Sequence, residues 1–542
     1  MHIRTVLGIS CLIVCTHFET KSMEQKGKDK EKEKPIMVRV DTQEDHPYLE
    51  ICPEERAYLE KRMPIAKDAL EKALKCSLDG KYIPKIAILG SGGGYRAACF
   101  TTGSLDGIRK INLFNALTHM IGLSGSTWAI SSYVTNAKES KDFKKLKEFK
   151  KALSHHMARP FHETTDEEKE EIKKSFADQK EHHQQFNLGS AYGALLAKTF
   201  LADQGDQKQR VTLSQQANRI RKAKRPLPVY AAIDSRNSVS ENPPHYAVTP
   251  FEVMNLTHKT AIPTRVCGSL FYDGVITEPN SENNEPPLAR FMAGFGSAFS
   301  ANLENVETAI ESSSETMKHI HKLWAECAPH MAHQPHIPLL EKFKHTIEDT
   351  RLLPFWIDLP NYAYNMEGQE NAHEKRLKLA DGGLAENIPF AQAMQCEGRQ
   401  PDIMIIFDAS AGIMGEELKK MGQYARDHNI PCPPIDYTQV GQKTMSIFKD
   451  PSNPKAPVII YMPRISDPEL WKKHKAHAMC SQFNLDNLDL EHETNNGWAK
   501  TEHFCYTPDH STQVINQATF NVWANRKEIF KTIQEVIEER SK

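Results

Sequence analysis

A serine set among small residues is the first candidate for chemistry in this sequence. The segment G-L-S-G-S at 122–126 begins in the last two residues of a predicted strand, 118–123, and precedes a helix pattern. This is the nucleophile-elbow pattern G-x-S-x-G with Ser126 in place of the last glycine, in which a sharp strand-to-helix turn exposes the serine hydroxyl. This context makes Ser124 a candidate nucleophile, although a match of this kind alone is often an ordinary turn.

A glycine-rich loop, G-S-G-G-G-Y-R at 90–96, precedes the elbow and lies between an apolar run and a helix pattern. Consecutive glycines allow positive φ, and their N–H groups ahead of a helix form an anion site. A P-loop is excluded because it needs G-K-[ST]. A dinucleotide site is disfavoured because the next strand, 118–123, lacks the acidic residue that binds ribose. An oxyanion hole for an ester carbonyl is the remaining use.

The base that such a serine needs is harder to recognise. A serine hydroxyl is a weak nucleophile until a base accepts its proton, and the usual base is a histidine oriented by an acid. None of the 24 histidines lies in an obvious loop after a late strand. Asp381 does, because it ends the apolar run 377–380 and precedes two glycines, which allow close approach of another loop. In isolation, the same pattern is typical of a turn aspartate bonded to its own backbone.

The elements that position these residues follow from the hydrophobic runs. Short apolar runs that predict buried strands occur at 85–89, 118–123, 229–233, 403–407 and 458–462. The order strand–turn–helix occurs twice around the two motifs, which predicts an α/β fold with a mostly parallel sheet. Two polar, helix-like stretches, 138–224 and 278–368, are expected to be insertions that cap this sheet.

The composition bounds the function classes. The 542 residues carry 68 Lys and Arg against 70 Asp and Glu, a net charge of −2, so there is no electrostatic case for nucleic acid as a partner. The 11 cysteines include no C-x-x-C pair, and we expect no metal site and no cofactor. No protein partner is predicted.

The first 50 residues have a different character. An apolar run at 6–14, preceded by basic residues, is too short to span a bilayer and fits the core of a signal peptide. We therefore expect a signal or lipoprotein leader at 1–22, a charged linker at 23–50 and the catalytic domain at 51–542. The leader predicts a secreted protein or one associated with the cell envelope. The alternative is a cytoplasmic protein bound peripherally to a membrane.

Taken in order, the motifs resemble the catalytic domain of the cytosolic (group IV) phospholipase A₂ family, whose fold is related to patatin. The glycine loop that ends in Arg96, the run G-L-S-G-S-T-W at 122–128, and D-G-G-L at 381–384 with Asn387 and Pro389 carry the resemblance. The chain looks most like the gamma-type member, which lacks a C₂ domain.

The resemblance implies a three-layer α/β/α sandwich with a helical cap, and a calcium-independent serine hydrolase that releases fatty acid from glycerophospholipids. Ser124 would be the nucleophile and Asp381 its base, in a dyad without a catalytic histidine. The N–H groups of Gly93 and Gly94 would form the oxyanion hole, and Arg96 would bind the lipid phosphate. The partner would be a phospholipid membrane or micelle surface.

Two other functions stay open at this point. One is a Ser–His–Asp esterase that acts on small esters, and the other is a catalytically inactive lipid-binding protein with the same fold. Phospholipase A₁, phospholipase A₂, lysophospholipase and transacylase activities are not distinguished, because the capping stretches that select the substrate show the least similarity to the family.

Overall fold

The computed structural model describes residues 36–41, 47–136, 143–181, 187–235, 243–277, 284–297, 315–327, 355–486, 488–501 and 503–542. From Met37 to Lys542 the chain forms one compact unit. The predicted leader at 1–22 lies outside the described residues, as does most of the predicted linker at 23–50.

Five parallel strands form the centre of the sheet, which has 12 strands in the described part of the chain. Their order is β5 (Leu227–Asp234), β4 (Leu117–Gly122), β3 (Ile86–Gly90), β14 (Ile403–Asp408) and β16 (Val458–Pro463). Every residue of these strands is buried, as expected of parallel strands covered by helices on both faces. The predicted α/β fold with a mostly parallel central sheet is confirmed.

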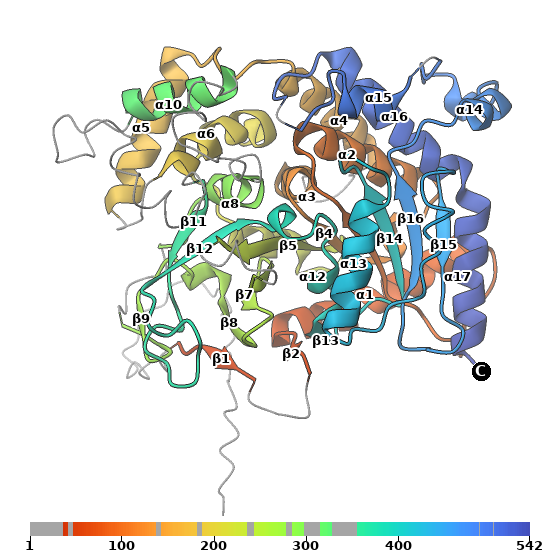
Figure 1. Ribbon diagram of the computed structural model, residues 1–542, viewed down its shortest axis with the longest axis horizontal. Coiled ribbons are helices and arrows are strands. Elements are labelled where there is room, and N and C mark those ends of the chain that lie inside the picture. The colour runs from red at the N-terminus through yellow and green to blue at the C-terminus, as the bar shows by residue number, and fades with distance from the viewer. Residues whose placement is uncertain are drawn as a thin grey trace, which may run out of the picture. The chain divides into compact units, whose positions relative to one another are not determined.

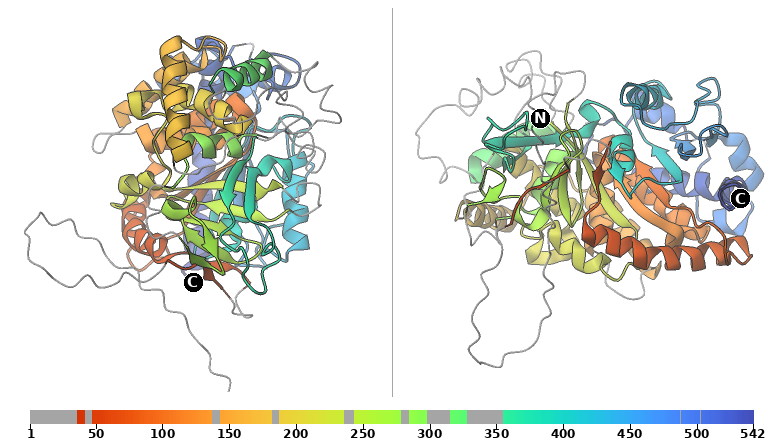
Figure 2. Two further views of the ribbon diagram at one scale, coloured as in Figure 1. Left: turned by 90° about the vertical axis from the view of Figure 1, so that its left-hand side faces the viewer. Right: turned by 90° about the horizontal axis from the view of Figure 1, so that it is seen from below.

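Helices cover the two faces of this sheet. Figure 2 shows α13 (Glu416–Asp427) on one side of the central strands and α1 (Pro53–Leu74) on the opposite side. The most extensive packing between two helices joins α2 (Gly94–Lys110) to α16 (Pro508–Ala524). Helix α17 (Arg526–Arg540) follows α16. None of the helices within the described ranges has the length and apolar composition needed to cross a membrane.

Four further helices gather over one end of the sheet (Figure 1): α4 (Phe143–Met157), α5 (Asp166–Glu181), α6 (Leu188–Phe200) and α10 (Glu315–Cys327). Helix α10 packs on α5 and α6, and α6 packs on α8 (Leu288–Phe295). All of them fall within 138–224 and 278–368, the stretches that we expected to cap the sheet.

The sheet also has an antiparallel extension that the sequence did not lead us to expect. It runs outward from β5 through β6 (His245–Val248), β7 (Glu252–Asn255), β8 (Thr260–Pro263) and β1 (Arg39–Val40), while β15 (Ser446–Phe448) adds to the opposite edge. Strands of four residues or fewer are too short for their alternation to be recognised. Strand β1 lies in the region expected to be a linker, and its Arg39 forms an ion pair of 2.6 Å with Glu252 of β7.

Candidate active site

Ser124 occupies a strained turn between β4 and α3 (Gly125–Asn136). Its φ is 52°, a left-handed conformation that costs a non-glycine residue about 1–2 kcal/mol. The Ser124 carbonyl accepts from the N–H of Thr127 at 2.9 Å, so the turn runs directly into the helix. A Cβ at Gly122 would lie only 3.0 Å from the Thr127 nitrogen. The structure thus places Ser124 at the strand-to-helix elbow that the sequence predicted.

Ser126, which replaces the last glycine of the elbow pattern, joins the elbow to the glycine loop. Its hydroxyl lies 2.7 Å from the Thr101 hydroxyl and donates to the Ser91 carbonyl. Gly90 leaves room for it, since a Cβ there would lie 2.7 Å from the Ser126 Cβ. A glycine at position 126 would lack both hydrogen bonds, and this is the structural reason for the departure from the pattern.

The glycine loop lies directly behind the Ser124 side chain. A Cβ at Gly92 would lie 2.9 Å from the Ser124 Cβ, and a Cβ at Gly125 would lie 2.0 Å from the carbonyl oxygen of Gly94. Gly93 and Gly94 have φ values of 134° and 58°. Positive φ and close approach both require glycine here. Because α2 begins at Gly94, the N-terminal partial charge of that helix favours a negative group at this loop.

Strand register brings the end of β12 (Arg376–Asp381) to the end of β4. On β5, Tyr230 pairs with Gly122 of β4, and Ala232 pairs with Asp381. Strand β6 occupies the other edge of β5 at these residues, so β4 and β12 share one edge and approach each other from opposite directions. Their paired positions are two residues apart on β5, roughly 6–7 Å. Asp381 and the elbow therefore meet head to head.

Asp381 is fully buried, and its loop rests on the elbow. One carboxylate oxygen accepts from the N–H of Gly383 at 2.9 Å, and a Cβ at Gly382 would lie 3.1 Å from the Leu123 side chain. Tyr192 of α6, in the cap, is close enough to the carboxylate for its charge to act on the tyrosine hydroxyl. Burial raises the pKa of the Tyr192 hydroxyl, and the charge of Asp381 raises it further. Tyr192 thus belongs to the surroundings of Asp381, which the sequence did not indicate.

Asn387 connects the aspartate loop to the glycine loop. Its side-chain oxygen accepts from the N–H of Gly92 at 3.0 Å, and its amide nitrogen donates to the Ser410 hydroxyl at 2.7 Å. Its own backbone N–H donates to Glu417 at 2.9 Å. One side chain therefore sets the position of the glycine loop relative to Asp381. The sequence motif contains Asn387, but no role could be assigned to it without these contacts.

Arg96 is buried among protein acceptors. Its guanidinium donates to the carbonyls of Ala409 at 2.7 Å and Ala499 at 2.6 Å, and to the Thr501 hydroxyl at 3.2 Å. These contacts join the start of α2 to two loops that are distant in sequence. Contact between Arg96 and a lipid phosphate stays a prediction.

A cluster of aromatic rings joins the site to the cap. Tyr95 of α2 and Trp128 of α3 meet edge to face, with 6.3 Å between ring centroids. Phe200 of α6 and Phe504 contact both rings, and the Trp128 indole donates to the Met292 carbonyl of α8 at 2.7 Å. Buried aromatic pairs contribute about 0.5–1.5 kcal/mol each beyond their area. The glycine loop, the elbow helix and the cap therefore pack as one unit.

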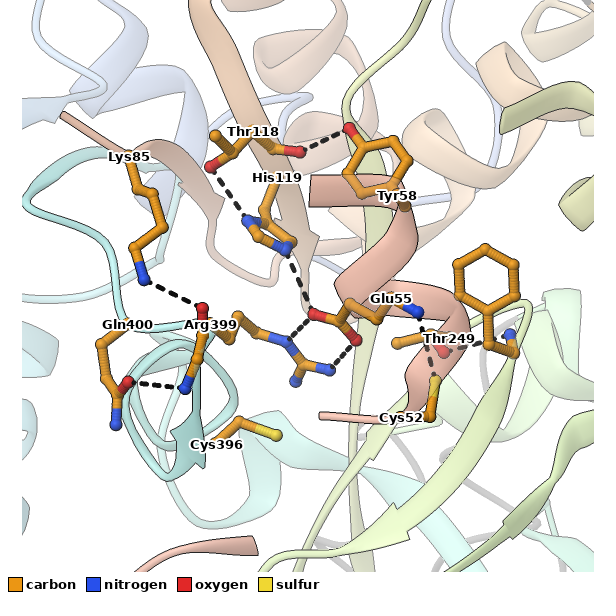
Figure 3. Close-up of polar contacts among 12 residues, drawn as sticks. Cys52, Glu55, Tyr58, Lys85, Thr118, His119, Thr249, Cys396, Arg399 and Gln400 are labelled. Atoms are coloured by element: carbon orange, nitrogen blue, oxygen red, sulfur yellow. Dashed lines mark hydrogen bonds and ion pairs between the residues drawn. The ribbon is translucent and has the colours of Figure 1, made fainter. Parts of the chain in front are cut away.

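A buried ion pair holds the opposite end of β4. Glu55 of α1 accepts from Arg399 at 2.7 and 2.8 Å and lies 3.2 Å from His119 of β4 (Figure 3). All three side chains are at most 1% exposed. Burial opposes ionisation of Glu55, but Arg399 and His119 outweigh it and lower the Glu55 pKa to about 2. The strand that ends at the elbow is thus attached at its start to α1.

The structure brings Ser124, Asp381, Gly93 and Gly94 together at the carboxyl ends of the parallel strands. Among the described residues, no group of three or more His, Cys, Asp and Glu side chains is arranged to hold a metal ion. An elbow serine, a glycine loop and a buried aspartate at the carboxyl ends of parallel strands define the class: an α/β protein with a nucleophile elbow.

Comparison with known proteins places the chain within this class. Residues 86–422 match the model of the lysophospholipase catalytic domain, and the chain belongs to that family. Cytosolic phospholipase A2 epsilon of Mus musculus is 23% identical over 546 residues, which cover 90% of this chain and 60% of that protein. Cytosolic phospholipase A2 gamma of Mus musculus is also 23% identical, over 89% of this chain and 91% of that protein. The gamma-type protein is thus one of the relatives, but its sequence identity to this chain is no higher than that of the epsilon protein.

The fold has a solved counterpart. The structure of human GIVD cytosolic phospholipase A2 matches with a TM-score of 0.72 and 19% identity, covering 95% of this chain and 70% of that one. The same protein was also solved in complex with methyl γ-linolenyl fluorophosphonate, and that structure matches with a TM-score of 0.69. The chain spans about 60% of the length of several curated relatives.

One prediction made from the sequence is wrong. The expected secreted or cell-envelope location does not hold, because relatives that match about nine-tenths of the chain are cytosolic phospholipases A2. The apolar run at 6–14, on which that expectation rested, lies outside the described residues.

We expect Asn387→Ala to slow ester hydrolysis by about tenfold, because the Gly92 N–H keeps only its longer hydrogen bond to the Asn387 carbonyl, at 3.3 Å, and the Ser410 hydroxyl loses a donor. Each lost hydrogen bond is worth about 0.5–1.5 kcal/mol. The measurement is kcat on a soluble ester, with the melting temperature recorded in parallel. Asn453→Ala, which removes a turn amide that accepts from Lys455, is the matched control. An unchanged kcat for Asn387→Ala would show that the glycine loop does not depend on this contact.

We expect the free energy of unfolding to decrease as the pH falls from about 4.5 towards 2. Glu55 has a pKa of about 2 in the fold against 4.5 ordinarily, so its contribution is complete above the higher value and is lost through the lower one. The size is on the order of 3 kcal/mol. Urea unfolding across this range measures it. Glu55→Gln combined with Arg399→Gln should flatten the dependence, whereas the exposed Glu535→Gln should not.

Proposed function

We propose that this protein is a serine hydrolase that releases fatty acid from glycerophospholipids at a membrane or micelle surface. The observation that carries the proposal is the head-to-head meeting of β4 and β12 along β5, which sets Asp381 against the Ser124 elbow. Membership in the lysophospholipase catalytic domain family supports the substrate class. So do the names of the relatives and the fluorophosphonate with a long γ-linolenyl hydrocarbon chain that is bound in the human structural neighbour.

The first half-reaction acylates the serine. The Ser124 oxygen attacks the ester carbonyl carbon while its proton passes to the Asp381 carboxylate. The carbonyl oxygen becomes an oxyanion, which receives hydrogen bonds from the N–H groups of Gly93 and Gly94 at the start of α2. The ester C–O bond then breaks, and the proton on Asp381 goes to the departing alcohol, which is a lysophospholipid or glycerophosphoester. The fatty-acyl group stays on Ser124.

The second half-reaction uses the same groups in reverse. A water molecule attacks the acyl carbon and gives its proton to Asp381, and the oxyanion forms again at Gly93 and Gly94. The acyl–oxygen bond breaks, Ser124 recovers its proton from Asp381, and fatty acid leaves. Side chains and backbone N–H groups supply all of this chemistry, so we expect turnover to persist in the presence of a calcium chelator.

Burial is what makes a carboxylate useful as the base. Asp381 is fully buried and the Ser124 side chain is 5% exposed, so water competes weakly for their hydrogen bonds once substrate occupies the site. The hydrogen bond from Gly92 to Asn387 orients the loop that carries the oxyanion donors, and the hydrogen bond from Gly383 orients the Asp381 carboxylate. A dyad without histidine thus depends more heavily on preorganised loops.

The test is fatty-acid release from phosphatidylcholine and lysophosphatidylcholine vesicles, with calcium and with chelator. We expect Ser124→Ala and Asp381→Asn each to lower release by about three orders of magnitude or more, and a fluorophosphonate to label Ser124. The same substitutions at two separate exposed residues, Ser481→Ala and Asp427→Asn, are the matched controls, and we expect them to leave fatty-acid release unchanged. Full activity in Asp381→Asn would refute the dyad and favour a histidine base, and no release by the natural sequence would refute the lipase.

Arg96 needs a separate experiment, because its contacts with three protein acceptors favour a role in positioning the loops. We expect Arg96→Lys to lower turnover by about tenfold or more on both phosphatidylcholine and a phosphate-free soluble ester. The readout is the ratio of the two losses. A loss confined to the phospholipid would instead support the phosphate contact that the sequence resemblance implied.

A further inference from the structure

A largely exposed isoleucine lies in a loop beside the glycine loop of the candidate active site. Ile413 is 78% exposed, the highest value among the large apolar side chains that the structure describes as exposed. It lies in the loop between β14 and α13, whose residues Ala411 and Gly412 are also exposed. We call residues 411–414, sequence Ala-Gly-Ile-Met, the apolar tip. None of its side chains is polar.

The apolar tip is held in place on the side nearest the sheet. The Ser410 and Gly412 carbonyls accept from the buried Arg464, the latter at 3.3 Å. The Gly412 N–H donates to the side chain of Asn495 at 3.1 Å. A loop fixed in this way cannot fold its isoleucine back into the core, so the exposure of Ile413 is built into the structure.

The other side of the tip is equally constrained. Gly415 has a φ of 85°, and a Cβ there would lie 2.5 Å from the side chain of Val440. Met414 packs against Gly441, where a Cβ would lie 3.0 Å from its side chain. Ile413 is therefore the one residue of the tip whose large apolar side chain points to solvent instead of packing against the molecule.

The apolar tip is connected to Ser124 through a short series of contacts. Ser410, three residues before Ile413, accepts from Asn387 at 2.7 Å. Asn387 accepts from the N–H of Gly92, which lies directly behind the Ser124 side chain. The loop also leaves the sheet at the carboxyl end of β14, next to the glycine loop, since the Ala409 N–H donates to the Ser91 hydroxyl at 2.7 Å. The apolar tip and the glycine loop behind Ser124 thus belong to one hydrogen-bonded region at the carboxyl ends of the parallel strands.

The charges beside the tip largely cancel. In the first turns of α13, Lys419 pairs with Glu416 at 3.3 Å and Lys420 pairs with Glu417 at 2.8 Å. Exposed pairs of this kind leave little net attraction for an anionic surface. The driving force for contact must therefore be burial of apolar area, as when an apolar side chain enters the interfacial region of a lipid bilayer.

We propose that the apolar tip inserts into the lipid surface, with Ile413 as its anchor, and so seats the Ser124 elbow against the membrane. The proposal rests on the proposed function, because a lipid hydrolase must meet its substrate at such a surface. The described chain has a second group of exposed apolar side chains around β9 (Phe271–Tyr272), including Leu270 and Tyr272. Figure 1 shows β9 far from α13, so this group serves as the control surface.

The experiment measures partition of the full chain onto phosphatidylcholine vesicles by sedimentation, using Ser124→Ala so that lipid is not consumed. Adding Ile413→Asp should lower the partition coefficient by about tenfold or more, since a large apolar side chain is replaced by a charge. Tyr272→Asp, which also replaces an exposed large side chain by a charge but at the control surface, should leave the partition coefficient unchanged. High salt and added anionic lipid should have little effect. Ile413→Trp should shift its emission to shorter wavelength when vesicles are added.

Each outcome separates this inference from the proposed function. Equal partition of Ile413→Asp and its parent, or a loss in Tyr272→Asp instead, overturns the inference, as does binding that disappears at high salt. In the otherwise natural chain, Ile413→Asp should retain turnover of a soluble short-chain ester, and loss of that turnover would mean that the substitution damages the site itself. Vesicle binding that depends on Ile413 in a protein that releases no fatty acid would refute the function and leave the docking surface standing.

Discussion

The left-handed backbone of Ser124 is the constraint on which the rest of the site depends. A serine at a φ of 52° is unfavourable in isolation, so the surrounding structure must hold it there. Strand β4 does so from one side, because it is hydrogen-bonded to both β3 and β5 up to Gly122. Helix α3 does so from the other, through the hydrogen bond from Thr127 to the Ser124 carbonyl. A strand at the edge of the sheet could not enforce such a turn as firmly.

The glycine loop and β12 both approach the turn at Ser124. The glycine loop approaches the elbow so closely that a methyl group at Gly92 would collide with Ser124 and one at Gly125 would collide with Gly94. Ser126 joins the elbow to the glycine loop and to α2 by hydrogen bonds. On the opposite side, β12 enters along β5 where β4 ends. The carboxylate and the glycine loop therefore approach the same serine from different parts of the sheet, and Asn387, six residues after Asp381, hydrogen-bonds its own loop to the glycine loop.

The site is also supported at a distance. Tyr95 and Trp128 extend the glycine loop and the elbow helix into an aromatic cluster that includes cap residues. At the far end of β4, the buried Glu55–Arg399 pair joins α1 to the segment after β13 (Cys396–Glu397). Removing either ion would leave an uncompensated charge in the core, a cost of about 3–5 kcal/mol. Rigid support on both ends of one strand suits a reaction that relies on preorganised hydrogen-bond donors.

The sequence by itself determined the central strands, the elbow and the glycine loop, because each is local: a continuous apolar run marks a buried parallel strand, and glycines mark the positions that need positive φ or close approach. It also singled out Asp381, which follows an apolar run and precedes two glycines, but an aspartate in this pattern is compatible with an ordinary turn, and its role as the base came only from the resemblance. What the tertiary structure decided is non-local. The register of β5 placed Asp381 at the elbow, the hydrogen bonds of Asn387 joined residues far apart in the chain, and three distant acceptors surrounded Arg96. The short antiparallel strands carried too few residues to show a pattern, and only their pairing with β5 and its neighbours makes them strands.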